Sequence, residues 1–178
     1  MLDPVGKYLQ KKRNSMVLPE ISGLLLDIGC GTNILVKEYG YGIGIDVHPW
    51  PGINILLEDT SKLPIRDESI DTVTLIAVLN HIPNRDEVLH EVHRILKSNG
   101  KLIITMIPPQ ISQIWHYIRK PWDCDQHERG MKEGEVYGMT YLQVMECLND
   151  AGFKIIETKK FMMGINSLYI GIKKDIYE

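Results

Sequence analysis

Cysteine is scarce in this chain of 178 residues, and so is net charge of either sign. The three cysteines, Cys30, Cys124 and Cys147, are odd in number and widely spaced, which fits neither a disulfide framework nor a zinc site. This usage is typical of a reducing compartment, so we expect a cytoplasmic protein. Lys and Arg total 20 and Asp and Glu total 23, so the net charge of −3 gives no global attraction to nucleic acid or to an anionic membrane.

Long hydrophobic runs are absent as well. No apolar stretch approaches the roughly 20 residues that a membrane-spanning helix needs, so we expect no membrane partner. Residues 1–4 lack the basic and then apolar layout of a secretory signal peptide. There is no internal repeat and no low-complexity segment, and the length suits one domain with its own core. We therefore predict a single domain over residues 1–178.

The most informative stretch is a short apolar run that ends in a turn of small residues. Residues 24–28 predict a strand that is buried on both faces. Gly29 and Gly31 then allow the backbone to turn sharply and leave room for a ligand against it. Residues 34–39 predict a short helix whose first N–H groups face that ligand.

Two other interpretations of this stretch are open at this point. One is a buried strand with a glycine turn that binds nothing. The other is a dinucleotide-binding turn, but its Gly-x-Gly-x-x-Gly pattern needs glycine at the sixth place, which is Ile34 here. The motifs that follow in order favour a ligand-binding turn.

The strand, glycine turn and helix resemble the first motif of class I S-adenosylmethionine-dependent methyltransferases, of the small-molecule type called methyltransferase domain 11-like. The family pattern is an acidic residue and then Gly-x-Gly-x-Gly. Here the acid is Asp27, the first two glycines are Gly29 and Gly31, and Asn33 stands at the third place. Asn tolerates left-handed dihedrals better than most residues, so the turn remains compatible with the family motif.

The resemblance extends over about residues 24–173 and implies both a fold and a cofactor. The fold is α/β, a three-layer Rossmann-like arrangement whose seven-stranded, mainly parallel sheet has the order 3-2-1-4-5-7-6 and an antiparallel last strand. The cofactor is S-adenosyl-L-methionine, which we expect at the carboxyl ends of the strands, near the order reversal beside the first strand.

A second acidic position follows the predicted second strand, residues 43–46. In the resembled family the acid there, Asp46 in this chain, accepts hydrogen bonds from both ribose hydroxyls. By the same resemblance, Asp59 accepts the adenine amino proton and the Thr60 N–H meets a ring nitrogen, with Glu58 as the alternative acid. The cofactor-binding residues that the resemblance implies are Asp27, Gly29, Cys30, Gly31, Asp46, Val47, Asp59, Thr60 and Ala77.

Residues 78–83, Val-Leu-Asn-His-Ile-Pro, match the family's Val-Leu-x-His-Ile-Pro segment at the mouth of the site. The resemblance therefore places His81 near the region of methyl transfer. An equally weighted alternative is a structural histidine that hydrogen-bonds the loop. A base is needed only if the acceptor loses a proton, and His81, His116 and His127 are candidates because histidine titrates near neutral pH.

Hydrophobic spacing predicts the remaining elements. A third strand is expected over residues 53–57, a fourth over 72–77, and an amphipathic helix over 85–97. The later elements are a fifth strand, a last helix and two final strands, over residues 101–106, 140–151, 153–158 and 167–173.

The first 23 residues carry a short helical pattern and then the basic run Lys11-Lys12-Arg13, which we interpret as a solvated face. Members of the resembled family usually have a longer helical segment there, which helps to cover the cofactor. The short segment indicates either a more open site or a cover supplied by another chain, such as a homodimer partner.

Residues 110–139 interrupt the alternation of strands and helices, at the usual place of the family's substrate lid. Aromatic rings with nearby charges suit a small-molecule pocket, so Trp115, Tyr117 and Tyr137 are candidate substrate residues. The alternative is a surface loop with anchoring aromatic residues. The polar cluster at 123–127 lacks a recognisable ligand spacing, so we expect no metal.

These patterns predict an S-adenosylmethionine-dependent methyltransferase with an unidentified small-molecule acceptor. The alternative from another class is a catalytically silent cofactor-binding module that regulates or scaffolds a partner, because the same binding motifs would serve it. Adenine-modifying nucleic-acid methyltransferases carry an Asn/Asp-Pro-Pro-aromatic motif after the fourth strand. Residues 80–83 read Asn-His-Ile-Pro at that place, which argues against this subclass.

Overall fold

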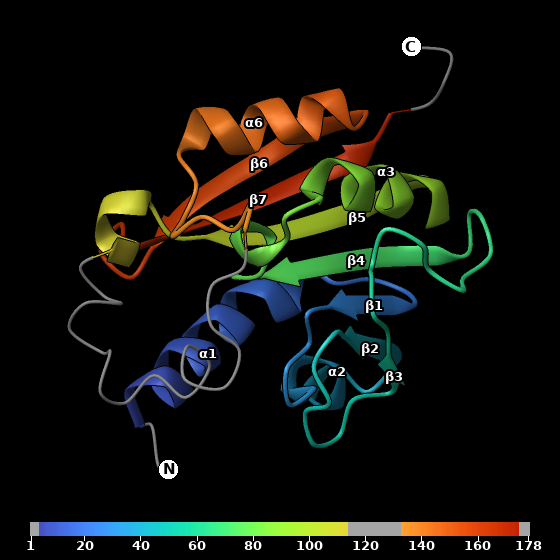
Figure 1. The fold of residues 1–178 in the computed structure, drawn as a ribbon, viewed down its shortest axis with the longest axis horizontal. Helices are drawn as coiled ribbons and strands as arrows, with labels where there is room; N and C mark the ends of the chain where they lie inside the picture. Colours follow the sequence, from blue (N-terminus) through green and yellow to red (C-terminus); the bar gives the residue numbers. More distant parts are fainter. Residues whose placement is uncertain (1–3, 114–132, 175–178) are drawn as a thin grey trace.

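The structure is a computed structural model that describes residues 4–113 and 133–174. In these residues, seven strands form one sheet of order β3-β2-β1-β4-β5-β7-β6 (Figure 1). The strands are β1 (Leu25–Ile28), β2 (Gly42–Asp46), β3 (Ile55–Leu56), β4 (Ile70–Ile76), β5 (Leu96–Met106), β6 (Phe153–Phe161) and β7 (Asn166–Lys173). The helices include α1 (Pro4–Val17), α2 (Ile34–Tyr39), α3 (Arg85–Ile95) and α6 (Tyr141–Asp150), with 3₁₀ turns η1 (Leu18–Glu20) and η2 (Leu79–His81).

The sheet confirms the predicted fold. Neighbouring strands from β3 to β5 run parallel, and β7 pairs antiparallel with both β5 and β6. The strand order reverses beside β1, which pairs with β2 on one side and β4 on the other. Connections that leave β1 and β4 at such a reversal run to opposite faces of the sheet, so a crevice opens at the carboxyl ends of these strands.

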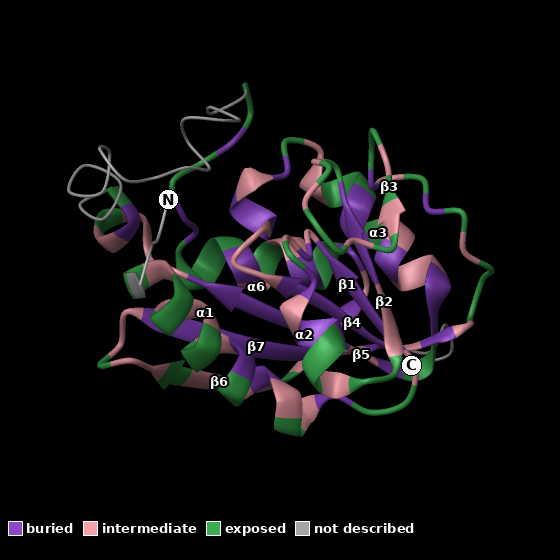
Figure 2. Cartoon of the chain, turned by 90° about the horizontal axis from the view of Figure 1, so that it is seen from below, coloured by how far each residue is buried: buried purple, intermediate pink, exposed green. Residues whose placement is uncertain are grey.

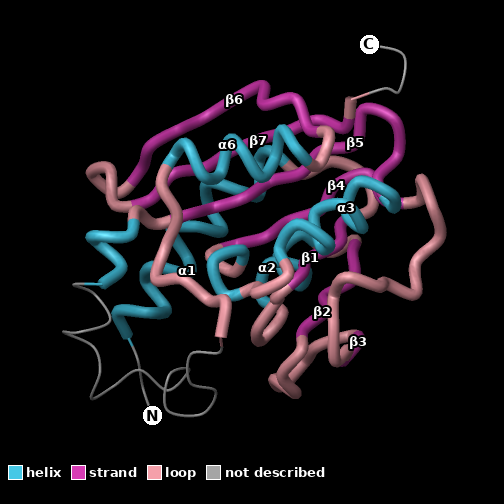
Figure 3. Tube along the Cα trace, turned by 45° about the horizontal axis from the view of Figure 1, so that its top comes forward, coloured by secondary structure: helices cyan, strands magenta, loops and turns pink. Residues whose placement is uncertain are grey.

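Apolar residues fill both faces of the sheet, because successive residues of a strand point to opposite sides. Leu25 packs in one cluster with Val17 of α1 and Leu35 of α2. Leu26 packs in the other cluster, which includes Val92 of α3. Figure 2 shows the strands as mostly buried, and Figure 3 shows α3 and α6 lying across the same side of the sheet. The arrangement has three layers, with helices on both faces.

Two predicted boundaries around α3 are wrong. The helix predicted over residues 85–97 ends at Ile95, and the strand predicted over 101–106 begins at Leu96. Leu96 is fully buried and extended, with φ −69° and ψ 136°, and it pairs with Ile70. The helix therefore ends before Leu96, although the helical pattern continues, because this side chain is buried in the sheet. The register of β4 and β5 shifts directly after the Ile70–Leu96 pair.

The third strand is shorter than the predicted range of 53–57 and keeps only Ile55 and Leu56, at the edge of the sheet. Asn54 uses its side chain as well as its backbone: Oδ1 accepts a hydrogen bond from the Gly44 N–H at 2.8 Å, and the Asn54 N–H donates to the Gly44 carbonyl at 3.0 Å. The last two strands are longer than predicted, because their antiparallel pairing continues to the hairpin turn.

Candidate functional site

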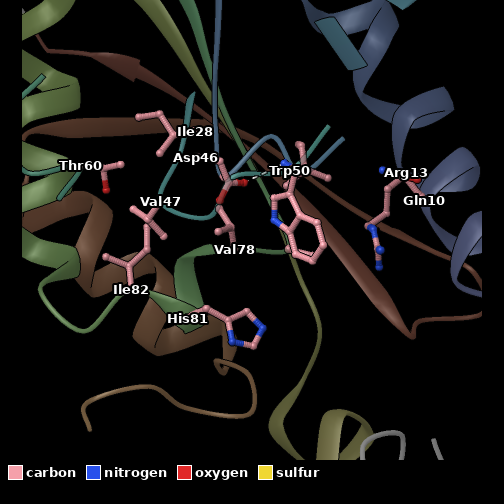
Figure 4. Close-up of a pocket in the computed structure, with 14 residues that line it drawn as sticks. Gln10, Arg13, Ile28, Asp46, Val47, Trp50, Thr60, Val78, His81 and Ile82 are labelled. Carbon is pink, nitrogen blue, oxygen red and sulfur yellow. Dashed lines mark hydrogen bonds between the residues drawn. The ribbon is translucent and has the colours of Figure 1, made fainter. Parts of the chain in front are cut away.

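A cavity of about 330 Å³ lies at the carboxyl ends of β1, β2 and β4 (Figure 4). Its walls come from the glycine turn after β1, the end of β2 with the loop that follows, the segment after β4, and α1. A second cavity of about 200 Å³ adjoins it. The two cavities share the lining residues Gln10, Arg13, Gly29, Gly31 and Ile76, so they form one site at the order reversal.

The glycine turn folds over the end of β2. The N–H groups of Gly29 and Cys30 both donate to the Ile45 carbonyl, at 2.8 and 3.1 Å. Gly29 has φ 71°, and a Cβ there would collide with the Val78 side chain. Gly31 has φ 53°, lines both cavities, and has nothing within 4 Å of a Cβ built on it. The turn therefore presents bare backbone to the cavity.

Asn33 occupies the place of the third family glycine and adopts the expected left-handed conformation, with φ 59° and ψ 33°. Its buried side chain has a role that glycine could not fill. Nδ2 donates to the Gly52 carbonyl at 2.9 Å and to Asn54 Oδ1 at 2.9 Å. Because Asn54 Oδ1 also accepts from the Gly44 N–H, Asn33 ties the glycine turn to the loop that follows β2.

Asp46 ends β2 at the edge of the cavity, as the sequence predicted. Its carboxylate is 7% exposed and accepts two backbone hydrogen bonds, from the Gly31 N–H to Oδ2 at 2.8 Å and from the His48 N–H to Oδ1 at 2.9 Å. Each carboxylate oxygen has a further lone pair. Asp46 can therefore accept two more donors side by side, which suits a pair of ribose hydroxyls.

Asp27 lies in the second cavity and is almost fully buried. Burial raises the pKa of this carboxyl to about 7; the hydrogen bond from Thr74 Oγ1, 2.6 Å long, lowers the pKa, and the nearby charge of Asp46 raises it. Burial raises the pKa of the Cys30 thiol to about 12, with further contributions from Asp27 and Asp46. Cys30 is therefore a protonated wall residue near neutral pH and not a nucleophile.

α1 covers one side of the site, which corrects the interpretation of the N-terminal basic run. Gln10 and Arg13 line both cavities, and Figure 4 shows both side chains coming from α1. Lys11 and Lys12 are exposed as expected, but Arg13 is a cavity residue. The sequence feature that could have indicated this is the spacing of three residues between Gln10 and Arg13, which puts both side chains on one face of the helix. α1 thus supplies cover on that side, and a covering partner chain or homodimer stays a prediction.

Trp50 and Ala77 complete the walls. Trp50, in the loop after β2, lies in the cavity lining. Its ring packs on His48 with centroids 4.3 Å apart. Ala77, which follows β4, has φ 56° and also lines the cavity. Val47 and Thr60 line it as well, and their cofactor roles stay predictions.

Asp59 is the predicted cofactor residue that the structure does not bring to the cavity lining. It is exposed, and its carboxylate accepts hydrogen bonds from the Ser61 N–H at 2.8 Å, from Ser61 Oγ at 2.6 Å and from Asn84 Nδ2 at 3.2 Å. These bonds, led by that of the Ser61 side chain, lower the pKa of Asp59. Glu58, the alternative acid, is exposed too. The adenine role of Asp59 stays a prediction.

His81 sits in η2 and lines the main cavity. Its Nδ1 lies 3.3 Å from Oε2 of Glu135, whose side chain is fully buried. The sequence pattern singled out His81 but assigned no role to Glu135, which is distant in the chain. Of the other predicted residues, Tyr137 is 39% exposed, and Trp115, His116, Tyr117 and His127 lie outside the described residues.

Within residues 4–113 and 133–174, no group of three or more His, Cys, Asp or Glu side chains is arranged to hold a metal ion. The predicted polar cluster at 123–127 lies outside these ranges. Over the same part of the chain, no helix has both the length and the apolar character needed to cross a membrane.

Known proteins are similar in sequence to this chain. A family model described as a methyltransferase domain matches residues 26–104. The demethylmenaquinone methyltransferase of Lactobacillus johnsonii is 30% identical over an alignment of 183 positions, gaps included, that covers 84% of this chain and 75% of that protein. An uncharacterized protein of Methanocaldococcus jannaschii is 26% identical over 139 residues, which cover 74% of this chain and 65% of that protein.

A solved structure shares the fold. It is the 1,6-didemethyltoxoflavin-N1-methyltransferase of Burkholderia thailandensis, with 1,6-didemethyltoxoflavin and S-adenosylhomocysteine bound. Its TM-score to this chain is 0.68 at 13% identity, over 96% of this chain and 83% of that one. The chain belongs to the class I S-adenosylmethionine-dependent methyltransferases. It is a methyl-transferring enzyme, and its cofactor is S-adenosylmethionine.

The residues of the site fit this cofactor. Gly31 offers backbone with open space in front of it, Asp46 offers a paired acceptor, and the adjoining cavity holds the Arg13 guanidinium and the Asp27 carboxyl, whose pKa is about 7. A nucleoside with a zwitterionic amino-acid tail needs these three features.

Proposed function

We propose that this methyltransferase acts on a small-molecule acceptor with a hydroxyl-bearing aromatic ring, of the hydroquinone class. The observation that carries the proposal is the match to a demethylmenaquinone methyltransferase over most of both chains. The walls of the main cavity support it. Ile28, Val78 and Ile82 are apolar and Trp50 adds a flat ring, which suits an aromatic acceptor.

In this proposal the polar groups hold the cofactor. Asp46 accepts the ribose hydroxyls, and Val47 and Thr60 flank the adenine ring. In the adjoining cavity, the Arg13 guanidinium pairs with the carboxylate of the amino-acid tail and Asp27 with its ammonium. A cationic partner also favours the ionised form of Asp27, so binding lowers its pKa.

When bound, S-adenosylmethionine would supply an electrophilic methyl carbon, with its sulfur as the leaving group. The chain's own part is to hold the acceptor in line and to exclude water. His81 lines the same cavity as Asp46, so an acceptor hydroxyl has a titratable proton acceptor within the site.

The test is a transfer assay on the purified protein. Methyl-labelled cofactor is incubated with a short-chain demethylmenaquinol kept reduced with dithiothreitol, and the recovered quinone is counted and analysed by mass. Label in the quinone ring supports the proposal. A parallel incubation with cell extract identifies any other acceptor, and a labelled product without an aromatic hydroxyl would refute the acceptor class. Tight cofactor binding by calorimetry without transfer in either incubation would favour the silent module.

A further inference from the structure

The pair formed by His81 and Glu135 is not explained by cofactor binding. The two side chains approach to 3.3 Å, between Nδ1 and Oε2. His81 is 19% exposed and lines the cavity, whereas the Glu135 side chain is fully buried and does not line it. Burial of a carboxylate is costly unless the group is paired or hydrogen-bonded. This carboxylate is therefore held against the one histidine that, among the described residues, lines the main cavity.

The chain on either side of Glu135 is fastened to the segment that carries His81. The Val136 N–H donates to the Asn80 carbonyl at 2.9 Å, and Asn80 Nδ2 donates to the Val136 carbonyl at 3.1 Å. On the other side, the Arg85 guanidinium donates to the Gly134 carbonyl at 2.7 Å. Because Asn80 is the chain neighbour of His81, these bonds fix the position of both partners, and the Glu135–His81 distance is a property of the fold.

Other charges face the same region from the elements packed around it. Asp46 from β2 and Arg13 from α1 line the cavity, and Arg85 from α3 lies beside the Glu135 segment. Glu135 is the carboxylate within hydrogen-bond range of Nδ1. A carboxylate at Nδ1 keeps a proton on that nitrogen, so the lone pair of Nε2 is free to accept a proton. The carboxylate also stabilises the imidazolium that then forms. The 3.3 Å separation is long for such a bond, as catalytic bonds often are before the substrate binds.

We propose that Glu135 is a positioning residue that orients His81, so that His81 Nε2 accepts the proton of the acceptor hydroxyl. This inference rests on the proposed function, and His81 and Glu135 are the two residues to which it gives a role in methyl transfer. In this step the acceptor O–H bond breaks, its electron pair stays on the acceptor, and the proton adds to Nε2. Glu135 balances the positive charge on the ring. The proton then passes to solvent. Once the ring carbon carries the methyl group, it loses its own hydrogen as a proton and the oxygen takes a proton back, so a net one proton leaves for each methyl group transferred.

The first test measures His81 directly and needs no acceptor. The ring nitrogens are followed by ¹⁵N NMR as a function of pH in the wild type, in Glu135→Gln and in Glu133→Gln. Glu133 is an exposed residue two positions away, so its variant is the matched control. Loss of the facing negative charge should lower the titration midpoint of His81 by about one unit or more in Glu135→Gln only. A midpoint that is the same in Glu135→Gln and the wild type would overturn the inference.

The second test separates proton transfer from structure. Two hydroquinone probes are compared: a short-chain demethylmenaquinol, and an analogue whose electron-withdrawing substituent lowers the pKa of its hydroxyl. Glu135→Gln should lower kcat on the first probe by roughly tenfold or more, with little effect on the second and none on cofactor affinity. His81→Asn should show the same pattern more strongly, and adding Glu135→Gln to it should change little. An equal loss on both probes would overturn the inference.

The two proposals fail in different ways. If the wild type methylates the first probe and Glu135→Gln does so equally well, the inference is wrong and the proposed function stands. If the wild type methylates neither probe, the proposed function is wrong, and the proton step falls with it. Thermal melting of each variant shows whether a loss of turnover reflects unfolding.

Discussion

Asp27→Asn should make the fold more stable and its stability less dependent on pH. The substitution keeps the size of the side chain and removes its ionisation, and Asn Oδ1 can still accept the bond from Thr74. In the folded chain the pKa of Asp27 is about 7, against a model-compound value of 3.8. Below the lower value both folded and unfolded chains hold the proton, and above the higher value both have lost it. Between them only the unfolded chain loses it, so stability falls as pH rises through this window.

The size of the effect follows from the shift. A difference of about three pKa units corresponds to about 4 kcal/mol of lost stability at full ionisation, of which about 3 kcal/mol falls between pH 5 and pH 8. For a chain of this length, each kcal/mol shifts the melting temperature by roughly 2–4 °C. Relative to Asp27→Asn, the wild type should therefore lose about 6–12 °C over this interval.

The assay is thermal and urea unfolding of the cofactor-free protein at both pH values. Asp71→Asn is a control of opposite sign, because the hydrogen bonds from Lys97 and from the Leu24 N–H lower the pKa of Asp71. Its ionised form stabilises the fold, so Asp71→Asn should be the less stable protein at the higher pH. The reasoning is refuted if the stability difference between wild type and Asp27→Asn is the same at both pH values.

The remaining predictions concern the cofactor and the turn. Asp46→Ala removes charge-assisted hydrogen bonds worth about 1.5–3 kcal/mol each, so cofactor affinity measured by calorimetry should fall at least roughly tenfold in a folded protein; unchanged affinity would contradict the ribose role. Gly31→Val should abolish cofactor binding. Gly40 also has a positive φ and open space around its Cβ position but lies outside the cavity, so Gly40→Val should affect stability alone. Equal cofactor binding in both variants would show that Gly31 serves folding only. Asn33→Gly should cost about 1–2 kcal/mol and speed hydrogen exchange at the Gly44 N–H, whereas Asn99→Gly, at an exposed residue with φ 58°, should not destabilise.

Local sequence carried most of the predicted fold. The run of leucines before Asp27 has no polar face, so it could form only a strand covered on both sides, and the glycines after it mark where the chain turns. The end of α3 was misjudged because the helical pattern continues past Ile95, while Leu96 is held in the sheet by its pairing with Ile70. A local pattern does not contain that long-range contact.

The cofactor side of the site was predictable where the side chain follows a strand end. Gly31 was found from the glycine turn and Asp46 from the family resemblance, and the two lie together because the carboxyl ends of neighbouring parallel strands meet at one edge of the sheet. Asp59 was placed by resemblance alone, and its local bonds to Ser61 hold it outside the cavity lining. Short-range hydrogen bonds of this kind depend on loop conformation, which periodicity does not specify.

By itself, the sequence determined the glycine turn and the acid at the end of β2, because each depends on residues that are neighbours in the chain, whereas the strand order came from the family resemblance. Only the tertiary structure decided which distant side chains join them. Arg13 reaches the site because α1 packs beside the glycine turn. Glu135 reaches His81 because one backbone bond and one bond from the Asn80 side chain, across 56 positions, fasten Val136 to Asn80. Such pairs are set by how packed elements meet in space, and no spacing along the chain encodes them.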